Sequence, residues 1–298
     1  MTIIDYQAFI EDHFAIVDKN EKVVPFLLNP VQKQIIDSWA TRHVILKARQ
    51  EGSSSLILAV CTVDFLLSAN SKSVCIAHDK DSTIKLFDRV KFYIRSFEEK
   101  TGQKVPLEYN TRSELVNDLN GATFYVGTAG SQSFGRSATL TNIHFSEFAF
   151  YKNPAEIFLS ASQAGTPKHI IIETTANGVG GFFYKMWNDA YSQKSNFRAH
   201  FFGWNENPEY SAPKNVSIDL TTDERNMQTR FNLTNQQLAW RRMKITELGS
   251  EITFRQEYPI TPEEAFISSG NPVFNVDALT FIKTKMCRPP LKTGSLVG

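Results

Sequence analysis

The sequence predicts an α/β fold in which a mostly parallel central sheet is covered by helices. Short apolar runs rich in β-branched residues alternate along the chain with segments whose apolar residues recur at helical spacing. Such alternation is typical of parallel strands joined by crossover helices, which bury both faces of the sheet. The predicted parallel strands are 43–47, 73–78, 139–146, 168–174 and 198–202.

The predicted helices fall between these strands. The first begins at Pro30, because Asn29 is a good N-cap residue and proline is favoured in the first turn. Segment 53–68 is apolar nearly all round, which predicts a central helix buried on every side. The other helical segments run from about Ile84 to Gly102 and start near Pro154 and near Gly181.

One pair of strands is predicted to be antiparallel. Asn120-Gly121 lies between the apolar segments 115–119 and 122–126. Asn-Gly between two apolar runs is the strongest short-range signal for a β-hairpin, because both residues tolerate positive φ. We therefore expect a hairpin inserted in the otherwise parallel arrangement.

The composition excludes several classes of protein. The chain has 298 residues, is 42% hydrophobic and carries a net charge of +1, which is typical of a globular protein rather than a disordered one. Three cysteines, Cys61, Cys75 and Cys287, are too few for a disulfide framework. The longest apolar stretch, 56–69, is too short to span a bilayer and contains Asp64, so no membrane association is expected.

The character of the chain changes after about residue 210. Residues 1–210 contain the alternating pattern and are predicted to form one core domain. Residues 221–249 are polar and helical, a short helix follows at 262–266, and we expect residues 211–268 to form a small helical subdomain. Residues 269–298 resemble a polar linker.

Ligands of such sheets bind beyond the carboxyl ends of the strands, and three segments there carry polar residues. The first is 47–55, between a strand and the buried helix, where a phosphate-binding loop would lie. Against the pattern G-x-x-x-x-G-K-[ST], Gly52 matches the second glycine and Ser54 the metal-binding hydroxyl. Ser53 replaces the lysine, and Lys47 stands where the first glycine belongs. The alternative is a serine-capped helix after a turn.

The other two segments follow later strands. Glu147 ends an apolar strand, a position from which a carboxylate can order and polarise an attacking water molecule, although Ser146 replaces the aspartate usual before it. Thr174, Thr175 and Asn177 end another strand, where hydroxyl and amide groups can sense a γ-phosphate. The alternatives are an ordinary exposed glutamate and a turn built by Asn-Gly.

Together, five segments resemble the large terminase subunit of tailed bacteriophages, the DNA-packaging motor. They are KARQEGSSS, GRS, IHFSEFAFY, IIETTANG and FRQEYPITPEEAF, and the resemblance covers about residues 26–269. It implies an ATPase domain of the RecA/ASCE type, then a helical lid subdomain, then a nuclease domain. The chain ends before an acidic triad could be placed, so we expect 269–298 to lead towards a nuclease domain that is missing here, and no nuclease activity.

The resemblance also implies roles for individual residues. Lys47 matches the lysine at the start of a deviant Walker A loop, and Glu147 matches the catalytic glutamate of Walker B. Gln32 is implied as the adenine reader and Arg49 as a second phosphate contact, while Arg136 resembles an arginine finger that acts on a neighbouring subunit. The implied ATP-binding loop comprises Lys47, Ala48, Arg49, Gln50, Glu51, Gly52, Ser53, Ser54 and Ser55. The implied coupling motif comprises Thr174, Thr175 and Asn177.

The implied cofactors are ATP and Mg²⁺, with Ser54 holding the metal and Glu147 reaching it through bound water. The implied partners are double-stranded DNA, further copies of the chain in a ring on the portal, the portal protein and the small terminase subunit. The implied location is the cytoplasm of the infected bacterial host. Two basic clusters are candidate DNA contacts: Arg241, Arg242 and Lys244, and then Lys283, Lys285, Arg288 and Lys292.

Two other functions are compatible with the same motifs. A helicase-like ATPase of the RecA class would share the loop and the acid but needs a second such domain, for which 298 residues leave no room. A nucleotide-binding scaffold with little turnover would be compatible with Ser53 and Ser146 at the positions of the usual lysine and aspartate.

Overall fold

A computed structural model describes residues 5–130, 139–163, 165–268, 282 and 286. Within this part of the chain, an eight-stranded sheet has the order β10-β3-β9-β8-β4-β7-β6-β5. The strands from β10 to β7 are parallel, and β6 and β5 add an antiparallel edge. The strands are β3 (Arg42–Lys47), β4 (Lys72–Ala77), β5 (Leu107–Asn110), β6 (Glu114–Asn117), β7 (Thr123–Thr128), β8 (Asn142–Ser146), β9 (His169–Thr174) and β10 (Arg198–Phe202). The predicted mostly parallel sheet is confirmed.

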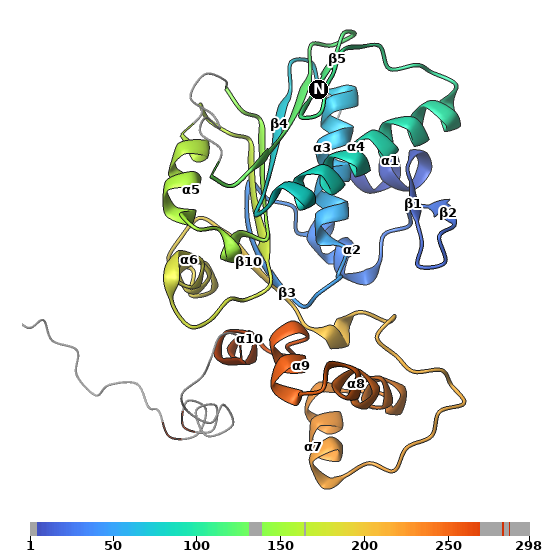
Figure 1. Ribbon diagram of the computed structural model, residues 1–298, viewed down its shortest axis with the longest axis vertical. Coiled ribbons are helices and arrows are strands. Elements are labelled where there is room, and N and C mark those ends of the chain that lie inside the picture. The colour runs from blue at the N-terminus through green and yellow to red at the C-terminus, as the bar shows by residue number, and fades with distance from the viewer. Residues whose placement is uncertain (1–4, 131–138, 164, 269–281, 283–285, 287–298) are drawn as a thin grey trace, which may run out of the picture.

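Helices cover both faces of this sheet (Figure 1). One face packs against α1 (Tyr6–His13), α2 (Pro30–Asp37), α3 (Ser53–Leu67) and α4 (Lys80–Thr101). The other face packs against α5 (Pro154–Ser162) and α6 (Gly181–Tyr191). No helix in the described ranges is long and apolar enough to cross a membrane.

The central position predicted for α3 is confirmed, and it explains the acid within that helix. Asp64 is 1% exposed and accepts hydrogen bonds from the Tyr6 hydroxyl at 2.9 Å and the Asn142 amide at 2.8 Å. A buried carboxylate without such donors would cost several kcal/mol, about 3–5 by comparison with broken buried ion pairs. Asp64 therefore ties the start of β8 and the first helix to the centre of the fold.

The hairpin predicted at Asn120-Gly121 joins β6 to β7, which pair antiparallel. Gly121 has φ +68°, and a Cβ atom there would lie 2.8 Å from Oδ1 of Asn70. Both the backbone conformation and the close approach thus require glycine. The amino-terminal elements β1 (Ala15–Val17) and β2 (Val23–Pro25) form a separate two-stranded sheet that the sequence pattern did not predict.

Residues after β10 form a cluster of helices beyond the carboxyl end of β3 (Figure 1). It contains α7 (Thr222–Phe231), α8 (Asn235–Leu248), α9 (Glu251–Glu257) and α10 (Pro262–Ser268). The helical structure expected over 221–249 is confirmed, and the segment forms two helices. Asn232 ends α7 in the left-handed region, and Thr234 begins α8 with a capping box closed by Gln237. These capping residues divide the stretch into two helices.

Candidate active site

The carboxyl ends of three adjacent strands, β3, β9 and β8, meet the amino terminus of α3. Leu46 on β3 is the register partner of Thr174 on β9, and Glu173 on β9 is the partner of Ser146 on β8. The sheet order therefore brings together three segments that are separate in the chain, with Lys47 lying 100 residues from Glu147 and Ser146 lying 27 residues from Glu173. This is the edge where an α/β sheet binds its ligand.

The loop from β3 to α3 has a backbone suited to an anion. Gln50 has φ +56° and Gly52 has φ +79°, both in the left-handed region. A Cβ atom on Gly52 would lie 2.7 Å from Nε2 of Gln32, so the position is closed to other residues. Gly52 is also the N-cap of α3, so the expected alternative of a serine-capped helix is wrong. No side chain at the N-cap competes with an anion for the amide groups of the first turn.

Two side chains from the start of α2 brace this loop from behind. Gln32 donates from Nε2 to the Gly52 carbonyl at 2.9 Å, and Asn29 donates to the Glu51 carbonyl at 3.1 Å. Gln32 is 4% exposed, and its Oε1 accepts from the Asn29 amide in a capping box. In this structure the side chain of Gln32 therefore supports the loop, and an adenine contact would have to compete with these bonds.

The loop is also joined to the helical cluster that follows β10. The Arg49 amide donates to the Glu257 carbonyl at 3.0 Å, and the Tyr210 hydroxyl donates to the Arg49 carbonyl at 2.5 Å. The Arg49 guanidinium forms an ion pair with the Glu257 carboxylate, and Ala48 packs into the apolar cluster of the same helices. The backbone and the side chain of Arg49 are thus both bound by residues of the helical cluster. Gln50, the next residue, is exposed.

The side chain of Lys47 lies between two carboxylates. Its Nζ is 3.1 Å from Oε1 of Glu147 and 3.2 Å from Oε2 of Glu173. The Lys47 side chain is 5% exposed, that of Glu173 is fully buried, and that of Glu147 is 29% exposed. Burial alone would lower the pKa of Lys47, but the two carboxylates raise it above its ordinary value. Lys47 is therefore a charged lysine in a nearly buried cluster of three charges.

Glu173 is a residue of this cluster that the sequence interpretation did not single out. Its Oε1 accepts hydrogen bonds from Ser54 Oγ at 2.6 Å and Ser146 Oγ at 2.8 Å, and Nε2 of His144 lies 3.4 Å away. Burial opposes ionisation of Glu173, but Lys47 and these donors outweigh it and hold the pKa below its ordinary value. The available signal was an acid directly after the apolar run Ile170-Ile171-Ile172.

Glu147 is not an ordinary exposed glutamate. It has φ +53°, a left-handed conformation that is costly outside glycine and is one of the kinds of backbone strain found at active sites. Its Oε2 accepts from the Thr175 amide at 3.2 Å and the Thr174 hydroxyl at 3.4 Å. Asn177 is farther away, and its amide donates to the Ala149 carbonyl at 3.1 Å. Two of the three residues expected to form a coupling motif therefore contact Glu147 directly.

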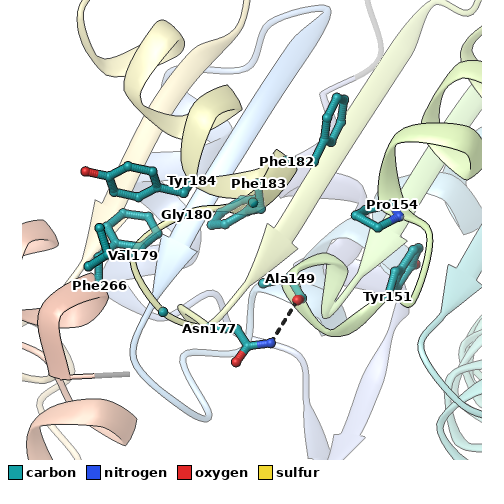
Figure 2. A pocket seen from close by; sticks show the side chains of 12 residues that line it. Ala149, Tyr151, Pro154, Asn177, Val179, Gly180, Phe182, Phe183, Tyr184 and Phe266 are labelled. Atoms are coloured by element: carbon teal, nitrogen blue, oxygen red, sulfur yellow. Dashed lines mark hydrogen bonds between the residues drawn. The ribbon is translucent and has the colours of Figure 1, made fainter. Parts of the chain in front are cut away.

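A pocket of about 320 Å³ opens beside this edge of the sheet (Figure 2). It is lined largely by aromatic side chains and glycines of 178–184, with Ala149, Tyr151 and Phe266. Figure 2 shows Asn177 at its border, hydrogen bonded to Ala149. None of the three charged residues of the cluster lines it.

Other residues expected to act at the site lie elsewhere. Arg136 is outside the described residues, as are the basic residues at 283, 285, 288 and 292 and the segment that contains Cys287. The other basic cluster, at 241–244, is engaged by carboxylates of the helices α7, α8 and α9. Arg241 pairs with Glu251, Arg242 with Glu224, and Lys244 with Glu247.

Comparison with solved structures gives the same architecture. The ATPase domain of the large terminase of Thermus phage P74-26 aligns with a TM-score of 0.54 and 18% identity, over 78% of this chain and 92% of that domain. The large terminase of bacteriophage HK97 aligns with a TM-score of 0.59 and 18% identity, over 84% of this chain and 52% of that protein.

The fold is similar to that of phage large terminases. The architecture expected from the sequence motifs is thus confirmed. The chain spans about half the length of the HK97 protein. No protein-family model matches the sequence, and no curated protein matches it. Because the identity to both solved structures is 18%, the comparison shows a shared fold and does not by itself assign an activity.

A pH-dependent effect on stability is expected from Glu51 in the loop. The carboxylate is 0% exposed, and neither oxygen has a hydrogen-bonding partner of good geometry in the described part of the chain. Burial raises the pKa of Glu51 from 4.5 to about 8, against the weaker opposing effect of Lys47. Between these values the folded protein binds more protons than the unfolded chain, so stability falls as the pH rises through this window.

Glu51→Gln should remove this dependence and raise the free energy of unfolding at pH 8 by up to about 4 kcal/mol. Urea unfolding from pH 5 to pH 8 measures the difference between variant and wild type. Glu108→Gln, at an exposed position on β5, is the matched control and should leave the profile unchanged. Parallel profiles for Glu51→Gln and wild type would show that Glu51 is not a buried, protonated acid.

Proposed function

We propose that this chain is the ATPase motor domain of a viral large terminase, which hydrolyses ATP to drive double-stranded DNA into a procapsid. One observation carries the proposal: Lys47 and Glu147, 100 residues apart in sequence, lie 3.1 Å from each other at the amino terminus of α3. A cation for the phosphates and a carboxylate for the attacking water are the two charged groups that such a reaction needs. The similarity to terminase ATPase domains supports the same reading.

In this proposal the loop 47–55 binds the phosphates of ATP. The first-turn amides of α3 and the Nζ of Lys47 supply the positive field, which compensates for serine at position 53. Lys47 pairs with Glu147, and phosphates bound on the loop would compete for its Nζ and free a carboxylate oxygen. Glu147 would then accept a proton from the attacking water. Substrate binding would thereby release the base.

The oxygen donors at the site suit magnesium, which the reaction would use to neutralise phosphate charge. The Ser54 hydroxyl, in the first turn of α3, would hold the metal, and Glu147 would act on it through bound water. Among the described residues, no group of three or more His, Cys, Asp or Glu side chains forms a metal site by itself. A magnesium ion would therefore depend on the phosphate oxygens for part of its coordination, as is usual for nucleotide enzymes.

Movement would be transmitted along two sets of contacts. Thr174 and Thr175 contact Glu147, so a change at the carboxylate reaches the end of β9. The bonds of Arg49 to Glu257 and Tyr210 join the phosphate loop to the helical cluster. We assign residues 1–210 to the ATPase core, 211–268 to a lid subdomain that responds to the loop, and 269–298 to a linker towards a nuclease domain.

The proposed partners follow from the same function. They are double-stranded DNA, further copies of the chain in a ring, the portal protein and the small terminase subunit, in the cytoplasm of the infected bacterium. Arg136 would act on the site of a neighbouring copy in that ring. The lone domain would accordingly be a weak ATPase, and turnover would rise with assembly.

Binding of a fluorescent ATP analogue, followed by phosphate release at increasing protein concentration with duplex DNA, tests this function. We expect binding that needs Lys47 and turnover that rises faster than protein concentration. Lys104→Ala, an exposed lysine on the surface, is the control. Binding without turnover at any concentration would favour a nucleotide-binding scaffold, and strand separation would favour a helicase-like enzyme. Absence of binding would contradict all three.

A further inference from the structure

The site has no carboxylate at the position where a P-loop ATPase normally holds its metal. That position, directly before Glu147 at the end of β8, is occupied by Ser146. A neutral hydroxyl is a weaker magnesium ligand than a carboxylate, and Ser54 supplies only another hydroxyl. A chain with serine there would be expected to bind the metal poorly, unless a carboxylate reaches the same place from elsewhere.

The sheet supplies such a carboxylate from the neighbouring strand. Ser146 on β8 and Glu173 on β9 are register partners in a parallel pair, so their side chains lie on the same face of the sheet. Oε1 of Glu173 is 2.8 Å from the hydroxyl of Ser146 and 2.6 Å from the hydroxyl of Ser54. Glutamate is one methylene longer than aspartate, which compensates for its position one strand away.

The charge at the site also favours a cation. One positive charge, on Lys47, faces two carboxylates, Glu147 and Glu173. Glu173 is fully buried, and a buried carboxylate is expensive unless it is fully paired. When Lys47 moves to the phosphates, this carboxylate would need a new counter-charge. A divalent ion next to Ser54 would supply it.

We propose that Glu173 replaces the missing aspartate of position 146 and holds the divalent cation of the nucleotide together with Ser54. The proposal rests on the nucleotide-binding function proposed above. It assigns to β9 a task that belongs to the adjacent strand β8 in the usual arrangement. It also explains why an acid occupies the end of an otherwise apolar central strand.

The affinity of Mn²⁺ for the complex of the full chain with ADP, measured from the electron paramagnetic resonance signal of free Mn²⁺, tests the assignment without any turnover. Glu173→Gln retains the shape and one acceptor oxygen for Ser54 and Ser146 but loses the charge. We expect it to weaken Mn²⁺ binding by at least about tenfold. ADP binding in the presence of a chelator should change much less, because Lys47 and the loop remain.

Two further variants separate metal binding from a purely structural role. In Ser146→Asp/Glu173→Gln, the carboxylate moves back to β8, and Mn²⁺ affinity should recover to within about threefold of wild type. Ser146→Asp alone should add little, because the metal already has its carboxylate. A structural role for Glu173 would not be restored by a charge on the other strand.

Three results would overturn the proposal. They are unchanged Mn²⁺ affinity in Glu173→Gln, no recovery in a folded double variant that still binds ADP, and a large gain from Ser146→Asp alone. Each of these leaves nucleotide binding intact and refutes only the role of Glu173. Failure of the wild-type chain to bind ADP, with or without metal, would instead refute the nucleotide-binding function and this site with it.

Discussion

Glu147→Gln should bind ATP normally and hydrolyse it about 10²–10⁴-fold more slowly than wild type, which is the usual contribution of a general base. Glutamine preserves the size of the side chain and keeps an oxygen that can accept from Thr175 and Thr174. It removes the basic oxygen that now pairs with Lys47. Binding and chemistry should therefore separate in this variant.

Phosphate release in a single turnover, with assembled protein and duplex DNA, measures the effect. Glu156→Gln, an exposed acid in the first turn of the nearby helix α5, is the matched control and should hydrolyse ATP like wild type. Turnover that is unchanged in Glu147→Gln would mean that another group activates the water.

Lys47→Met should have a double effect, on stability and on nucleotide binding. Removing the ammonium group leaves Glu173 buried without its counter-charge, which typically costs about 3–5 kcal/mol. It also removes the cation from the phosphate loop, because Ser53 cannot supply one. Ser53→Ala should be mild by comparison, since that hydroxyl makes only a 3.5 Å contact with Glu173.

The two effects of Lys47 can be separated by a second substitution. Lys47→Met/Glu173→Gln removes both buried charges and should recover most of the lost stability, while ATP binding stays absent. Urea unfolding and titration with a fluorescent ATP analogue measure the two quantities on the same samples. Equal and mild losses of binding in Lys47→Met and Ser53→Ala would refute the role of Lys47, and Arg49 would be the next candidate.

Much of the fold follows from local patterns in the sequence. The strand 43–47 and the apolar helix after it are recognisable from β-branched composition and from apolar residues on every side. Capping residues decide boundaries that periodicity does not, as at Thr234, where a capping box interrupts a stretch that would otherwise continue as one helix. The short strands near residues 15 and 24 have too few residues for any periodicity to be visible.

The site depends on information that is not local. The loop around Gly52 and the acid at 147 are visible in sequence because each follows an apolar strand. Glu173 also follows an apolar run, but its role was not recognisable, because it depends on the strand order β3-β9-β8, which brings it beside Ser146 and within reach of Lys47. The contacts of Gln32 with Gly52 and of Arg49 with Glu257 are likewise tertiary, so the sequence does not show them.

A crystal structure of the chain with a non-hydrolysable ATP analogue and magnesium tests the central claim most directly. We expect phosphate density on the first-turn amides between Gly52 and Ser55, with Lys47 Nζ on the phosphates instead of on Glu147. Nucleotide bound in the pocket beside Asn177, or an intact 3.1 Å pair between Lys47 and Glu147 with nucleotide present, would contradict it.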